Sequence, residues 1–256
     1  TVKDEVKTLI RENLTDFRSI MSIETEFVDP EIVYLKLMTS FNIDSTLSTA
    51  NSESYRQQIS DLISSYFLDK LDSFGDIFRR SNLLSQIDDH SPAILNSKMT
   101  VNALRQINIR TFFNEVDAYH QLRGTTPPDF IERDITVNFP FLLATPDNDD
   151  YVIVTSPFRY YNQNAVIKNK LGSLTLQIMD TRDNVLVSNV GDYQPADGTV
   201  NFKSWRMERE TNDIIKVNAT PANQSTIMPL RNYLFELDDD SVVLVNLERD
   251  GTKVLL

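Results

Sequence analysis

Histidine and cysteine side chains, which carry much of enzyme catalysis and metal binding, are scarce in this chain. It contains 2 histidines and no cysteine, which excludes disulfides, thiolate nucleophiles and cysteine-based zinc sites. His90 follows two aspartates at the end of a helical pattern, where a cation stabilises the helix dipole. His120 has no patterned partner. A serine-type triad would need one of these histidines, but the chain has no Gly-x-Ser-x-Gly motif.

Carboxylates form three candidate groups, which are residues 147–150, residues 238–240 and the pair Glu208 and Glu210. The first two groups have neither the glycine nor the terminal glutamate of a calcium-binding loop, so we interpret both as solvated turns between strands. Glu208 and Glu210 could share one strand face, and a glycosidase would need two carboxylates about 5 to 10 Å apart. Many exposed strands show the same spacing. We therefore predict no catalytic residues, no metal site and no cofactor, and we expect that the protein is not an enzyme.

Aromatic side chains in the second half of the chain allow a different function. They are Phe158, Tyr160, Tyr161, Tyr193 and Trp205. In a β-rich domain such residues could line a sugar-binding face, although aromatic side chains more often form a core. A glycan-binding module or adhesin is therefore the alternative function that the sequence leaves open.

Charge and hydropathy exclude several partners. The 25 basic and 37 acidic side chains give a formal net charge of −12, so the surface on average repels phosphate and we expect no nucleic-acid partner. We find no run of about 18 apolar residues and no signal-peptide pattern, so we expect no membrane partner. The chain begins without methionine, close to a helical pattern, and we expect a fragment or a processed product.

The elements that must position these residues begin with a sheet and the helices that cover it. Residues 32–43 form an extended apolar run that predicts a strand. Residues 52–74 place apolar side chains at intervals of three and four, which predicts a long helix. A shorter helical pattern follows at residues 79–87, and the alternation over residues 99–105 predicts a returning strand.

Two further elements are predicted upstream, a helix over residues 3–17 and a strand over residues 19–28. The order helix, strand, strand, helix, helix, strand corresponds to a split βαβ (ferredoxin-like) domain that lacks its first strand. We therefore predict an α+β domain over residues 1–113 and a linker over residues 114–134, which contains a proline pair. The last domain, residues 135–256, is predicted to be β-rich.

This last domain is predicted from short β-rich segments separated by turn residues. The segments are residues 135–143, 151–155, 174–179, 185–190, 200–202, 214–217, 233–237 and 242–247. Their even spacing favours an all-β, sandwich-like fold.

Several motifs occur in an order that resembles one protein family. They are residues 28–30 (Val-Asp-Pro), 74–78 (Phe-Gly-Asp-Ile-Phe), 81–84 (Ser-Asn-Leu-Leu), 97–100 (Ser-Lys-Met-Thr), 190–197 (Val-Gly-Asp-Tyr-Gln-Pro-Ala-Asp) and 230–234 (Leu-Arg-Asn-Tyr-Leu). Together they resemble the baseplate J-like family, and more narrowly the carboxyl-terminal part of the large baseplate wedge subunits of T-even-type contractile-tailed phages. The long amino-terminal half of that family has no counterpart in this sequence.

The resemblance implies a structural role and not an enzymatic one. It implies a subunit that forms a homodimer and whose copies close the inner wedge ring around the tail hub. The implied partners are further copies of the chain, other baseplate wedge proteins, and the tail hub and sheath-initiating proteins. The implied location is the tail baseplate of the virion, after assembly in the host cytoplasm. Under the alternative function, the β-rich part would be a glycan-binding or adhesin-type module of a virion.

Overall fold

The computed structural model describes residues 31–47, 51–228, 233–249 and 252–253. The predicted helix 3–17 and strand 19–28 lie outside these residues. The chain divides into two compact units, Thr1–Glu31 and Ile32–Leu256, and the account below concerns the second. None of the helices in the described residues is both long and apolar enough to cross a membrane.

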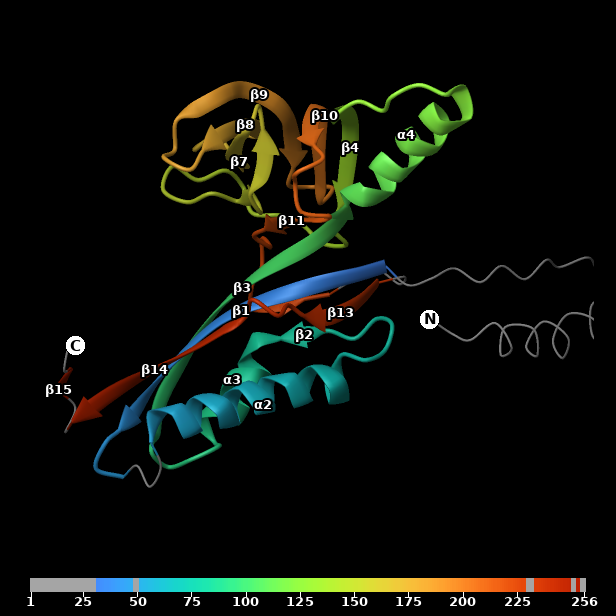
Figure 1. Cartoon of the computed structure of the whole chain (residues 1–256). Helices are drawn as coiled ribbons and strands as arrows, with labels where there is room; N and C mark the ends of the chain where they lie inside the picture. The colour runs from blue at the N-terminus through green and yellow to red at the C-terminus, as the bar shows by residue number, and fades with distance from the viewer. Residues whose placement is uncertain (1–30, 48–50, 229–232, 250–251, 254–256) are drawn as a thin grey trace, which may run out of the picture. The chain divides into compact units, whose positions relative to one another are not determined.

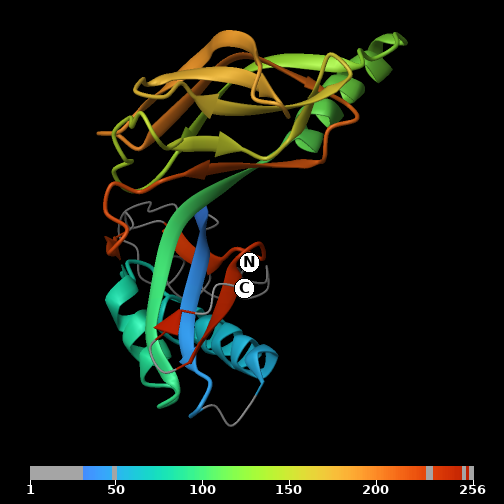
Figure 2. The same ribbon diagram turned by 90° about the vertical axis from the view of Figure 1, so that its left-hand side faces the viewer.

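A long central strand, β1 (Glu31–Asp44), organises the first part of this unit. It pairs antiparallel with β3 (Ile94–Asn108) on one side. On its other side it pairs parallel with β14 (Val242–Arg249) and also with β13 (Tyr233–Leu237). A short strand, β15 (Thr252–Lys253), pairs with the end of β14. Figure 2 shows β1 between β3 and the C-terminal strands.

Two helices, α2 (Ser52–Lys70) and α3 (Arg80–Asp88), cover one face of this sheet (Figure 1). They confirm the helices predicted at 52–74 and 79–87, although α2 ends four residues early. The side chain of Asn51 caps α2 by accepting a hydrogen bond from the backbone N–H of Ser54 at 2.8 Å. The apolar spacing of α2 buries Ile59, Ile63 and Phe67. Between the helices, β2 (Phe78–Arg79) pairs with β12 (Thr226–Ile227).

A third helix, α4 (Ile109–Arg123), follows β3 directly and was not predicted. Its start is capped by the side chain of Asn108, which accepts a hydrogen bond from the backbone N–H of Thr111 at 3.4 Å. It ends at Gly124, whose φ of 65° is the left-handed conformation that glycine adopts easily. The predicted linker 114–134 therefore contains most of a helix and the start of a strand.

The remaining strands form the β-rich part of the unit. They are β4 (Phe130–Asn138), β5 (Ile153–Thr155), β6 (Phe158–Tyr160), β7 (Gln163–Asn169), β8 (Thr175–Asp180), β9 (Val185–Gln194), β10 (Thr199–Glu208) and β11 (Ile214–Ala219). Within this part the strand order is β3-β11-β5-β7-β8-β9-β10-β4, and β6 pairs with β7. Its core is aromatic and contains the fully buried Trp205, Tyr193, Phe158 and Phe202. The sandwich-like packing that we predicted is not confirmed in its details.

The expected α+β class agrees with the three helices and the large sheet of the described residues, but the split βαβ arrangement is not confirmed. That arrangement would make β1 and β3 parallel and separate them by another strand. The two strands are instead direct antiparallel neighbours. The consecutive helices α2 and α3 return the chain to the end of the sheet where β1 stopped, so β3 runs back along it.

The predicted division of the chain at residues 114–134 stays a prediction. The strand pairing crosses it, because β13 and β14 come from the predicted second domain and lie beside β1. Phe235 of β13 and Val243 of β14 are buried in the same core as Leu37 of β1. The alternation of apolar and polar residues shows that each of these strands has a buried face. It does not show which segment of the chain packs against that face.

Candidate functional site

The two histidines lie at helix ends. His90 follows α3, and its Nε2 lies 3.0 Å from Oε1 of Gln58. His120 lies in the last turn of α4, with Nδ1 2.7 Å from the hydroxyl of Thr125. Within the described residues, no three His, Cys, Asp or Glu side chains are grouped so that they could hold a metal ion.

The acidic group at residues 238–240 differs from our interpretation as a solvated turn. Asp239 and Asp240 are exposed, but Asp238 is only 2% exposed. Its Oδ2 lies 2.9 Å from Nζ of Lys216, which also lies 2.7 Å from Oδ2 of Asp240. Lys216 belongs to β11, so this ion pair joins the β-rich part to the turn between β13 and β14. The interpretation was therefore wrong for Asp238, whose partner lies in a distant strand.

The other acidic group, residues 147–150, is an exposed turn as interpreted. Asp147 accepts a hydrogen bond from the backbone N–H of Asp149 through Oδ1, at 2.7 Å. Asp149 and Asp150 are exposed. This contact is a local one that aspartate commonly makes in turns.

Glu208 and Glu210 do not share a strand face. Glu208 is the last residue of β10 and is buried, whereas Glu210 is exposed in the turn that follows. Oε2 of Glu208 accepts a hydrogen bond from the backbone N–H of Asn162 at 3.1 Å. Each carboxylate also lies 3.6 Å from a guanidinium nitrogen, of Arg206 for Glu208 and of Arg159 for Glu210. The ion pairs therefore account for the positions of both carboxylates.

The candidate aromatic residues form core and not an exposed face. Trp205 is 0% exposed, and its ring centroid lies 5.2 Å from that of Phe158. Tyr193 is also fully buried, and its pKa is raised to about 12 by that burial. Only Tyr161 is largely exposed, at 59%. A sugar-binding face needs several exposed rings, so this part of the structure gives the glycan-binding alternative no support.

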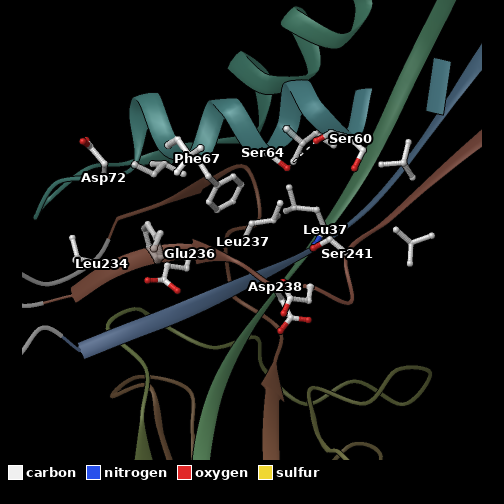
Figure 3. A pocket seen from close by; sticks show the side chains of 17 residues that line it. Leu37, Ser60, Ser64, Phe67, Asp72, Leu234, Glu236, Leu237, Asp238 and Ser241 are labelled. Carbon is white, nitrogen blue, oxygen red and sulfur yellow. Dashed lines mark hydrogen bonds between the residues drawn. The ribbon is translucent and has the colours of Figure 1, made fainter. Parts of the chain in front are cut away.

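A groove of about 650 Å³ lies between α2 and the strands β13 and β14 (Figure 3). Its apolar lining includes Leu37 of β1, Phe67 and Leu68 of α2, and Val243 of β14. Figure 3 shows Phe67 reaching from α2 toward the strands. The sequence reasoning missed this groove because it assigned the two strands to a separate domain.

The polar lining of the groove is acidic. It consists of four carboxylates, Asp72, Glu236, Asp238 and Asp239, together with three serines, Ser60, Ser64 and Ser241. None of the described residues that line the groove is a lysine or an arginine. Figure 3 shows the carboxylates of Glu236 and Asp238 pointing away from α2, so the space between α2 and the strands is lined mainly by apolar side chains.

The comparison with known families gives one match, over the first part of the described residues. Residues 31–106 match the family model described as baseplate structural protein gp6, C-terminal domain III. The match runs from β1 through α2 and α3 to β3, and of these elements α2 and β1 contribute residues to the lining of the groove. It is not a match to the baseplate J-like family, so that part of the resemblance is not confirmed. No curated protein matches the chain. The matched segment supports a structural role for the chain in a phage tail baseplate.

Proposed function

We propose that this chain is a structural subunit of a contractile phage tail baseplate. In this proposal it forms a homodimer, and its copies help to close the inner wedge ring around the tail hub. The observation that carries the proposal is the family match over residues 31–106. That segment contains the central strand β1, its neighbour β3 and the helices that cover them.

The open face of the sheet supports a contact between copies. The side chains of β1 alternate, and those that point away from α2 and α3 include Met38. Met38 pairs with Val242 of β14, and the next residue on that face of β14 is Leu244. These three apolar side chains are each at least 40% exposed. Adjacent apolar side chains on a surface mark interaction sites, so we place the self-contact here.

The proposal includes partners and excludes catalysis. The partners are other baseplate wedge proteins, the tail hub and the sheath-initiating proteins, and assembly takes place in the host cytoplasm. We propose no enzymatic activity, no cofactor, and no nucleic-acid or membrane partner. The acidic net charge of −12 keeps the subunit soluble before assembly, when its interfaces are not yet covered by partners.

Light scattering on the purified chain tests the self-contact. We expect a discrete dimer at moderate concentration, without rings or filaments. Leu244→Glu should shift the equilibrium to monomer, because it places a charge in the apolar contact. Leu122→Glu is the matched control, since Leu122 of α4 is 89% exposed and lies outside this face. A wild-type chain that stays monomeric at high concentration would contradict dimerisation, and open polymers would contradict a closed self-contact.

A further inference from the structure

We draw no further inference here: the strongest candidate, the apolar groove between α2 and the strands β13 and β14, carries none, because nothing in the structure shows what covers it.

Discussion

Nζ of Lys216 lies 2.9 Å from Oδ2 of Asp238, and this contact joins β11 to the turn between β13 and β14. The aspartate is almost fully buried, whereas the lysine side chain keeps 24% of its exposure. Asp238 also accepts a hydrogen bond from the backbone N–H of Asp240, at 3.0 Å through Oδ1. The turn that forms one end of the groove is therefore held by a strand of the β-rich part.

The first prediction concerns this ion pair. Lys216→Met should destabilise the chain by roughly 2 to 4 kcal/mol, because it leaves the buried Asp238 carboxylate without its cation. Lys203→Met is the control, since Lys203 forms an exposed ion pair with Asp192 at 3.2 Å and should cost less than about 1 kcal/mol. Urea unfolding measures both values. Equal losses in the two variants would contradict a special role for the buried pair.

The same cluster predicts how stability depends on pH. The hydrogen bond from Lys216 holds the pKa of the Asp240 carboxyl below its ordinary value of 3.8. Burial opposes the charge of Lys216, but its hydrogen bonds to Asp240 and Asp238 outweigh this, and its pKa is raised above 10.5. The lowered pKa gives stability that is present above 3.8 and lost as the pH falls through the lowered value. The raised pKa gives stability that is present below 10.5 and lost as the pH rises through the raised value.

We therefore expect a plateau between these limits. The difference in unfolding free energy between the wild type and Lys216→Met should stay constant between about pH 5 and pH 9. It should shrink below the ordinary Asp240 value of 3.8. Urea unfolding of both chains across the acidic range measures this difference. The same difference in strong acid as at neutral pH would show that ionised carboxylates are not its source.

Gly191 allows a second stability prediction. Its φ is 144°, and a Cβ at this position would lie 1.8 Å from the backbone oxygen of Asn201 on β10. Gly191→Ala must therefore push β9 and β10 apart, and we expect a loss of about 3 kcal/mol or more. Gly75 is the control, because its φ is also positive at 84° but a Cβ there would meet nothing within 4 Å. Gly75→Ala should cost about 1 kcal/mol by thermal or urea unfolding.

Local sequence patterns predicted where helices and strands lie better than they predicted which of these elements lie side by side. The spacing of Ile59, Ile63 and Phe67 correctly predicted the buried face of α2. The helix α4 was missed although Asn108 and Gly124 supply its two caps, because we interpreted residues 114–134 as a linker. The caps, read together with the apolar spacing between them, could have identified this helix.

The groove could not be predicted from these patterns. Val243 pairs with Thr39 and Val245 with Phe41 across about 200 positions of the chain. An alternating strand shows which of its faces is buried, but a parallel partner so distant leaves no mark in the local sequence. The contact between Lys216 and Asp238 could not be predicted for the same reason. The lysine alone is typical of a strand and the aspartate alone is typical of a turn.

Limited proteolysis tests the predicted division of the chain. Residues 124–126 are exposed and lie between α4 and β4 without regular structure. The next residues are held, because the side chain of Arg209 donates to the backbone oxygen of Pro128 at 2.9 Å. We expect the first cut at residues 124–126, where the backbone can enter a protease most easily. A first cut within α2 would contradict this division.

The guanidinium of Arg206 lies between two aromatic rings. Its central carbon is 3.4 Å from the ring centroid of Phe130 and 4.2 Å from that of Tyr161. Its Nε is 3.6 Å from Oε1 of Glu208, which is too long for a hydrogen bond, so the attraction between them is electrostatic. Both side chains are mostly buried, with 16% and 11% of their area exposed.

This arrangement predicts that Arg206 and Glu208 are energetically coupled. Arg206→Met keeps part of the packing against the rings but removes the charge, and it should cost about 2 to 3 kcal/mol because Glu208 stays buried without its cation. Glu208→Gln removes the negative charge and keeps an oxygen that can accept the hydrogen bond from the backbone of Asn162. If the charges attract each other, the double variant should lose about 1 to 2 kcal/mol less than the sum of the single losses. Urea unfolding of the four proteins completes this cycle. Strictly additive losses would mean that the stacking on Phe130 and Tyr161, and not the carboxylate, fixes the position of Arg206.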